Sequence, residues 1–128
     1  MIELDNVVKR YGSKTIIHNI SFDVKKGEIV GFLGPNGAGK TTTMRMIAGF
    51  TEATSGTVRV AGFDMATQRN QAASRLGYLP ESPPLYDILD VTSYLTFVAR
   101  AKGIPAVEIP RHLERVITAC RLEAVTTK

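Results

Sequence analysis

A glycine-rich run that ends in a lysine and two threonines is the part of this sequence best suited to chemistry. It consists of Gly34, Pro35, Asn36, Gly37, Ala38, Gly39, Lys40, Thr41 and Thr42. It contains the pattern G-x-x-x-x-G-K-S/T, in which glycines let the backbone curl and aim N–H groups at a polyphosphate. Lys40 is expected to reach the β- and γ-phosphates, the Thr41 hydroxyl suits Mg²⁺ as a hard oxygen ligand, and Thr42 is expected to contact a nearer phosphate. We call residues 34–41 the P-loop and expect a nucleotide phosphate site there.

The elements on either side give this pattern its meaning, because the alternative is a chance glycine-rich turn. Residues 29–33 are apolar on both faces, which predicts a buried strand over residues 28–33 before the loop. A helix is expected to begin near Lys40 and to end at Gly49. Its expected apolar stripe comprises Met44, Ile47 and Ala48. The order strand, loop, helix favours phosphate binding, since the helix N-terminus adds its dipole.

Other elements follow from periodicity and from turn residues. Strands are predicted over Ile2–Val8, Ile16–Val24 and Thr57–Val60. Beyond Pro80 the pattern becomes helical, with one helix capped by Thr92 and ending at Lys102 and Gly103. A second helix is predicted with Pro110 at its first position. Its expected stripe is Leu113, Val116, Ile117 and Cys120, so Cys120 is expected to be buried.

Bulk properties exclude several classes of protein. The 128 residues are 44% hydrophobic and 22% charged, as in an ordinary soluble globular domain. The longest apolar stretch is far shorter than the roughly 20 residues that cross a bilayer, and no secretory signal is visible, so a cytoplasmic location is expected. The single cysteine excludes an internal disulfide. A net charge of +4 that is scattered along the chain favours solvated faces, and no nucleic-acid partner is expected.

The stretch GPNGAGKTT, preceded by ISFDVKKGEIVGFLG, resembles the ATP-binding cassette (ABC) ATPases. The likeness extends over KRYGSKTIIHNISFDV, SGTVRVAGFD and GYLPESPPLYDILDVTSYLTFVA, and the last is similar to ATP-binding subunits of bacterial export systems. The resemblance implies an α/β fold: a three-layer P-loop NTPase core with an N-terminal antiparallel β-subdomain. Residues 1–81 would form this part, and residues 82–128 would begin a helical subdomain that is incomplete.

The resemblance also assigns roles outside the loop. Tyr11 matches the aromatic residue on which adenine stacks, although taken alone it would be an ordinary half-buried strand residue. Glu81 occupies a position where most of the family has a glutamine that contacts Mg²⁺ and the attacking water. A carboxylate can ligate Mg²⁺ but lacks the amide donor, so the resemblance implies a Mg²⁺ contact for Glu81 and does not extend to positioning the water. His18 and His112 match no catalytic position.

By this resemblance, the full-length protein binds ATP with Mg²⁺ and hydrolyses it to drive export. It would act at the cytoplasmic face of the membrane with a membrane-spanning subunit and a second ATP-binding subunit, in a head-to-tail dimer. The Walker B strand with its catalytic glutamate, the switch histidine and the signature motif are not found in the sequence. The isolated chain is therefore expected to be a loosely folded, essentially inactive fragment. The alternatives are a short nucleotide-binding protein without hydrolysis and a soluble ABC protein; the transported substrate is not readable.

Overall fold

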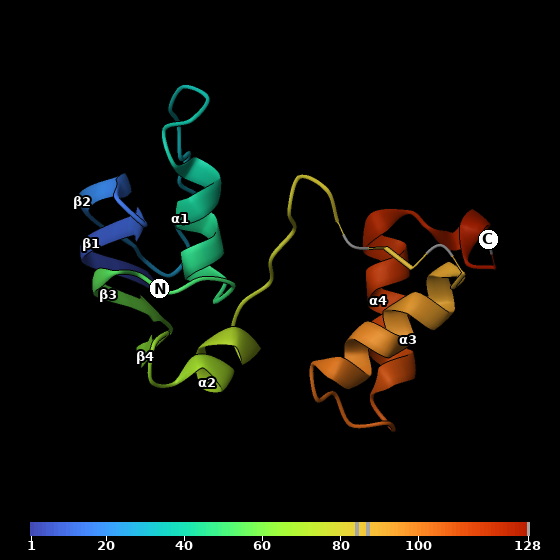
Figure 1. The fold of residues 1–128 in the computed structure, drawn as a ribbon. Coiled ribbons are helices and arrows are strands. Elements are labelled where there is room, and N and C mark those ends of the chain that lie inside the picture. Colours follow the sequence, from blue (N-terminus) through green and yellow to red (C-terminus); the bar gives the residue numbers. More distant parts are fainter. Residues whose placement is uncertain (84, 87, 128) are drawn as a thin grey trace. The chain divides into compact units, whose positions relative to one another are not determined.

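The structure is a computed structural model that describes residues 1–83, 85–86 and 88–127. The chain divides into two compact units, Met1–Tyr78 and Leu79–Lys128. The first unit holds the sheet and the P-loop, and the second holds helices (Figure 1). The subdomain boundary expected after residue 81 stays a prediction.

A four-stranded antiparallel sheet forms the base of the first unit. Its strands are β1 (Ile2–Tyr11), β2 (Lys14–Val24), β3 (Ser55–Val60) and β4 (Phe63–Asp64), in the order β2-β1-β3-β4. The expected strands Ile2–Val8, Ile16–Val24 and Thr57–Val60 are confirmed, and each is longer than expected. β4 and the short helix α2 (Arg69–Ser74) that follows it were not expected from the sequence.

Two asparagines interrupt the β1–β2 hairpin and decide which side chains face the core. Asn6 in β1 and Asn19 in β2 have left-handed φ angles of 49° and 53°, and the pairing register shifts beside both. An extra residue in one strand makes a β-bulge, and asparagine tolerates the left-handed region better than most residues. Leu4 and Val7 are therefore both buried although they lie three positions apart, where simple alternation would bury only one of them.

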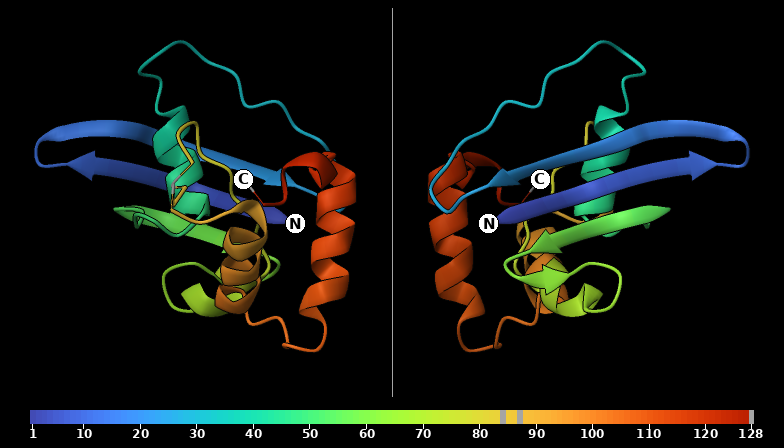
Figure 2. Two further views of the ribbon diagram at one scale, coloured as in Figure 1. Left: turned by 90° about the vertical axis from the view of Figure 1, so that its right-hand side faces the viewer. Right: turned by 90° about the vertical axis from the view of Figure 1, so that its left-hand side faces the viewer.

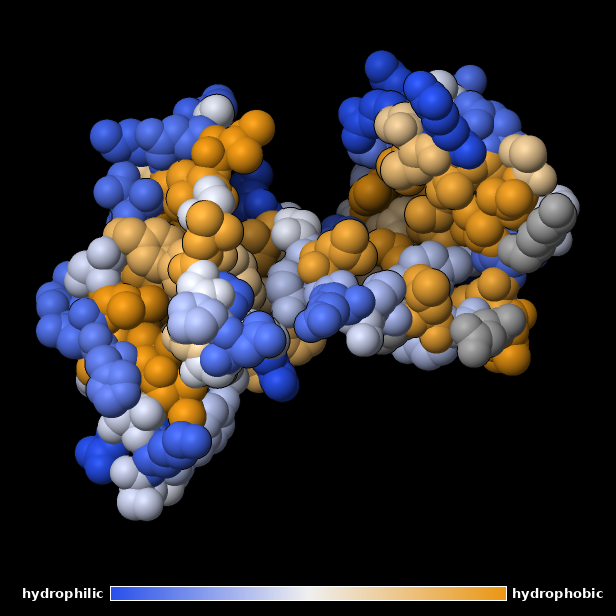
Figure 3. All heavy atoms as spheres, turned by 90° about the horizontal axis from the view of Figure 1, so that it is seen from above, coloured by the Kyte–Doolittle hydropathy of each residue, from blue (hydrophilic) through white to orange (hydrophobic). Residues whose placement is uncertain are grey.

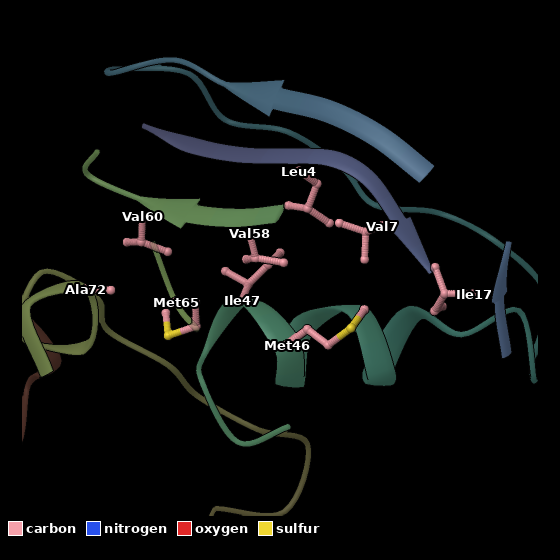
Figure 4. Packing of buried hydrophobic residues seen from close by; sticks show 9 residues of the cluster. All are labelled: Leu4, Val7, Ile17, Met46, Ile47, Val58, Val60, Met65 and Ala72. Atoms are coloured by element: carbon pink, nitrogen blue, oxygen red, sulfur yellow. The ribbon is translucent and has the colours of Figure 1, made fainter. Parts of the chain in front are cut away.

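The helix α1 (Lys40–Ile47) covers one face of this sheet (Figure 2). The core between them comprises Leu4, Val7, Ile17, Met46, Ile47, Val58, Val60, Met65 and Ala72 (Figure 4). A fully buried side chain of valine, leucine or methionine size contributes about 1.5–3 kcal/mol to stability. Apolar packing therefore fixes α1 to the sheet, and with it the end of the P-loop.

Gly49 ends α1 as expected, and it does so with a Schellman motif. Its φ is 78°, its N–H donates to the carbonyl of Met46 at 3.1 Å, and the N–H of Phe50 donates to the carbonyl of Arg45 at 2.9 Å. These bonds satisfy carbonyls that the helix end leaves without partners.

The expected apolar stripe of α1 is partly wrong. Ile47 is buried, but Met44 is 37% exposed and Ala48 is only half-buried. The buried residues of the helix are Thr43, Met46 and Ile47. These share one face at spacings of three and four, so α1 is rotated toward the sheet by about one residue from the expected orientation.

The strand expected over residues 28–33 is absent, and this prediction was wrong. The side chains of Ile29 and Leu33 are 101% and 93% exposed, and Figure 3 shows hydrophobic residues at the surface of this unit. A ring contact joins Phe32 to Phe22 of β2, with centroids 5.5 Å apart. A strand needs hydrogen bonds to a neighbouring strand. No described segment pairs with residues 28–33, so the three-layer core with a buried central strand is not formed by the described residues.

The second unit contains α3 (Val91–Ala101), α4 (Ile109–Cys120) and the 3-10 helix η1 (Glu123–Val125). Both expected helices are confirmed, and Gly103, with φ 74°, ends α3 as expected. The expected cap is wrong, because Asp90 caps α3 by accepting a hydrogen bond from the Ser93 N–H at 2.7 Å. Thr92 instead donates its hydroxyl to the carbonyl of Thr126 at 3.0 Å.

The second helix of this unit differs from expectation at its start and in the burial of its apolar face. α4 begins at Ile109, one residue before Pro110. Cys120 is exposed, so its expected burial is wrong, and the side chains of Leu113 and Ile117 are only partly covered. Periodicity defines an apolar face on a helix but does not say whether another element covers it. None of the described helices is long and apolar enough to cross a membrane.

Candidate functional site

The P-loop turns on two glycines with left-handed backbone angles. Gly37 and Gly39 have φ angles of 83° and 88°. The N–H of Ala38, which lies between these two glycines, donates to the carbonyl of Pro35 at 3.2 Å. L side chains rarely adopt this region, so glycine is needed at both positions. The loop thereby curls back on itself immediately before α1, as its pattern predicts.

Gly39 is also the point where the loop touches the sheet. A Cβ built on this residue overlaps Cδ1 of Ile17 in β2 and lies 3.3 Å from the carbonyl oxygen of Ile16. Gly34, at the other end of the loop, faces the Ala38 side chain, since a Cβ there would lie 3.3 Å from the Ala38 Cβ. Close approach therefore requires glycine at Gly39 even apart from its φ angle.

The start of α1 is open toward the loop. Because the helix begins at Lys40, its first N–H groups have no acceptor inside the helix. No acidic residue lies in the first turn, so nothing there competes with an incoming anion. The exposed Thr41 and the partly exposed Thr42 belong to this turn.

A buried threonine ties this helix start to the loop. Thr43 is 1% exposed, and both its N–H and its hydroxyl donate to the carbonyl of Gly39, at 2.9 and 3.0 Å. Thr43 was not expected from the sequence to have a role, because threonine beside Thr41 and Thr42 looks like a further exposed polar residue. Its burial shows that it stabilises the turn and does not face a ligand.

Lys40 extends its side chain back over the loop. Its Nζ donates hydrogen bonds to the carbonyls of Gly34 and, at 2.8 Å, Pro35. The ammonium group is therefore held at the start of the loop, against the carbonyls of Gly34 and Pro35. A phosphate group bound by the loop N–H groups would meet this charge directly.

Tyr11 lies at the end of β1, beside the tight turn of the hairpin. It pairs with Lys14, is 53% exposed and has the Nζ of Lys9 over its ring, 4.8 Å from the centroid. One aromatic face is thus in contact with a cation while half of the residue remains open to solvent. Its expected contact with adenine stays a prediction.

The remaining candidates lie apart from the loop in sequence. Glu81 is exposed and belongs to the second unit, so its expected Mg²⁺ contact stays a prediction. His18 is exposed on β2. His112 lies on α4, where its Nε2 is 3.7 Å from Glu108 and its Nδ1 is 3.3 Å from Arg115. The described residues contain no cluster of histidine, cysteine, aspartate or glutamate side chains able to hold a metal ion.

A family model described as "ABC transporter" matches residues 17–127. This chain belongs to the ABC transporter family. The match starts at Ile17 of β2, which packs against Gly39, and it includes the whole P-loop. The expected family and its P-loop fold class are thereby confirmed.

Curated relatives with known names are longer than this chain. Over 91% of its length the chain is 38% identical to the linearmycin resistance ATP-binding protein LnrL of Bacillus subtilis, and over 96% it is 35% identical to the Nod factor export ATP-binding protein I of Ralstonia nicotianae. Over 94% it is 43% identical to the spermidine/putrescine import ATP-binding protein PotA of Rubrobacter xylanophilus. It covers 38%, 38% and 31% of these proteins, respectively, which is less than two fifths of their length.

Solved structures agree with this assignment. The ATP-binding subunit of an ABC transporter matches 99% of the chain with a TM-score of 0.89 and 30% identity, and the chain covers 53% of it. A dimeric ATP-binding cassette in a post-hydrolysis state, bound to ADP and Pi, matches 98% with a TM-score of 0.81. At 21% identity this second likeness concerns the fold alone.

Proposed function

We propose that this chain supplies the ATP-binding face of a transport ATPase and binds ATP with Mg²⁺ at residues 34–42. The observation that carries the proposal is the combined geometry of the loop. Two left-handed glycines, the open start of α1 and the ammonium group of Lys40 all converge on one short segment. Such an arrangement provides N–H donors and a positive charge for a polyphosphate without crowding it.

The residues divide the work of binding between them. The backbone of the P-loop would hold the β-phosphate, and Lys40 would bridge to the γ-phosphate as a mobile charge. The exposed Thr41 hydroxyl would ligate Mg²⁺, which neutralises phosphate charge when bound, and Glu81 is proposed as a second ligand. Tyr11 would stack on the adenine.

In the whole protein, hydrolysis would be water attack on the γ-phosphorus, which breaks its bond to ADP and releases inorganic phosphate. The loop and Lys40 stabilise charge in that reaction but do not orient the water. We therefore propose that the chain of 128 residues binds ATP yet turns it over at a negligible rate. Orientation of the water would require a second ATP-binding subunit and motifs not found in this sequence.

The proposed task of the whole protein is export, together with a membrane-spanning subunit, at the cytoplasmic face of the membrane. Relatives named for Nod factor export and linearmycin resistance support this direction. The chain is also 43% identical to a spermidine/putrescine import protein, so its relatives support a role in transport more strongly than they support export. The second candidate is a nucleotide binder without hydrolysis, which the same loop geometry supports.

Equilibrium dialysis with radiolabelled ATP and Mg²⁺ tests the binding proposal on the purified chain. We expect saturable binding of one ATP per chain and a loss of at least about tenfold in affinity for Lys40→Ala, since a charge-assisted contact is worth roughly 1.5–3 kcal/mol. His18→Ala is the matched control, because His18 is exposed on β2 and has no role in the site. Equal affinity of Lys40→Ala and the native chain would contradict the proposal, and turnover that Lys40→Ala abolishes would contradict the inactivity.

A further inference from the structure

We infer that Lys9 is a positioning residue for the nucleotide base: it braces the ring of Tyr11 from one face so that the other face remains available to adenine. The inference rests on the proposed function, in which Tyr11 stacks on the base. It adds a residue that lies well before the P-loop in the sequence and outside its motif.

The strand places the two side chains on the same face of the sheet. The pairing of β1 with β2 shifts between Val7 and Lys9 and again between Lys9 and Arg10. Both shifts place the extra residue in β2, so the side chains of β1 keep their alternation from Val7 through Lys9 to Tyr11. Val7 is fully buried in the core beneath α1. Lys9 and Tyr11 therefore lie on the face of the sheet that carries α1, and the P-loop leads into α1.

The ammonium group of Lys9 makes two contacts that fix its position. It lies 4.8 Å from the centroid of the Tyr11 ring, within the range of a cation–π interaction, and it donates a hydrogen bond to the carbonyl of Glu52 at 2.6 Å. A cation that served only as solvated surface charge would have no such anchor. Lys9 thus connects the aromatic ring to the chain that follows α1.

The anchor itself is held to β1. The N–H of Thr54 donates to the carbonyl of Val8 at 2.8 Å, and the Thr54 hydroxyl accepts from the N–H of Arg10 at 2.9 Å. These bonds flank Lys9 in the sequence and fix the segment containing Glu52 beside it. The ammonium group of Lys9 is therefore anchored to a segment that backbone hydrogen bonds hold beside β1.

Within the sheet, β1 lies between the strand beside the anchor of Lys9 and the strand that the P-loop contacts. Residues 52–54 lie on the β3 side of β1, because Val8 pairs with Ser55 of β3. The P-loop meets the sheet on the other side, where Gly39 packs against Ile17 of β2. On this inference, Lys9 contacts the ring from the β3 side, and the face of Tyr11 toward β2 is the one left for a base whose phosphates occupy the loop.

The physical effect on binding has two parts. The contact restricts the ring to one orientation before the base arrives, which removes part of the entropy cost of ordering it. A cation on one face also withdraws electron density from the opposite face, and this favours stacking on an electron-rich purine. Neither effect acts on the phosphates, so the contribution of Lys9 depends on the base.

Competition dialysis with two ligands separates these effects, using Mg·ATP and Mg·tripolyphosphate at about 0.15 M salt, where the Debye length is about 8 Å. Lys9→Met keeps the length and apolar stem of the side chain but removes its charge. We expect it to weaken ATP binding about 2- to 5-fold, the range of an exposed cation–π contact, and to leave tripolyphosphate binding unchanged. Lys9→Arg should restore ATP affinity, and Lys9→Met should have no further effect in a Tyr11→Leu background.

Lys14→Met is the matched control. Lys14 is exposed, pairs with Tyr11 and has no described contact with the Tyr11 ring, so its substitution removes an equal charge without removing a ring contact. An independent readout is the proton NMR chemical shift of the Lys9 ε-methylene. The Tyr11 ring should move this shift upfield of the corresponding shift of Lys14, and in Tyr11→Leu the two shifts should become equal. This readout does not require bound nucleotide.

Three results would overturn the inference: equal weakening of ATP and tripolyphosphate, native ATP affinity in Lys9→Met or in Tyr11→Leu, or failure of Lys9→Arg to restore binding. Failure of the proposed function gives a different result, because then Lys40→Ala would bind both ligands as the native chain does. A native chain that binds neither ligand would overturn both.

Discussion

Gly39 joins the phosphate loop to the sheet, and it illustrates how one residue can serve two purposes. Its left-handed φ of 88° closes the curl of the loop, and its missing side chain lets the loop lie against Ile17. The motif requires glycine at this position for the first reason alone. Only the tertiary contact shows the second reason, because Ile17 lies far from the loop in sequence.

Gly39→Ala is expected to lower the free energy of unfolding of the first unit by about 2–5 kcal/mol, the sum of left-handed strain and overpacking. Gly62→Ala is the matched control, since Gly62 has a φ of 83° but open space around it. It should cost only the strain of about 1–2 kcal/mol. Urea unfolding measures both changes.

The overlap with Ile17 provides a second check on the same contact. The atom that an added Cβ would meet is Cδ1, which Ile17→Val removes. In the Ile17→Val background, Gly39→Ala should therefore lower the free energy of unfolding by little more than Gly62→Ala does. Strictly additive free energies in the double variant would show that the contact does not limit the site.

At the scale of elements, periodicity correctly indicated β1, β2, β3, α1, α3 and α4, because each carries apolar residues at the spacing of one face. The ends of these elements were harder to predict. The bulges at Asn6 and Asn19 were missed, since an asparagine in a strand can also be an ordinary exposed residue. The cap of α3 was assigned to Thr92 although Asp90, two residues earlier, forms the bond.

Asp90→Ala is expected to destabilise α3 by about 0.5–2 kcal/mol, because the Ser93 N–H loses its acceptor. Asp90→Asn retains a side-chain oxygen and should stay close to the native value. Amide hydrogen exchange at the first turn of α3 reads the effect locally. Equal exchange rates in Asp90→Ala and Asp90→Asn would show that the side chain does not cap this helix.

At the scale of the whole molecule, the exposed apolar residues within segment 28–33 bear on the solubility and self-association of the chain. Ile29 and Leu33 are almost fully exposed, and no described strand pairs with their segment. An exposed apolar segment with unpaired backbone groups promotes association with another chain, so we expect the protein to aggregate through these residues. Neither unit offers such a partner strand among its described residues.

Ile29→Lys is expected to raise the soluble, monomeric fraction of the chain without lowering its melting temperature. Its side chain is 101% exposed, so the lysine replaces a contact with water and disrupts no packing. Ile47→Lys is the contrasting variant, because Ile47 is 5% exposed in the core and a buried unpaired charge should unfold the first unit. Light scattering and thermal melting distinguish the two, and a lower melting temperature for Ile29→Lys would show that residues 28–33 are packed in solution.

The sequence by itself determined the family, the loop and most elements, because these depend on local patterns: glycines before a lysine, and apolar residues at the period of a strand or a helix. The tertiary structure decided which faces are covered. Ile29, Leu33 and Cys120 were expected to be buried but are exposed, while Thr43 is polar yet buried. The contact of Lys9 with Tyr11 and Glu52 likewise appears only in three dimensions, since burial and pairing depend on what other parts of the chain bring alongside.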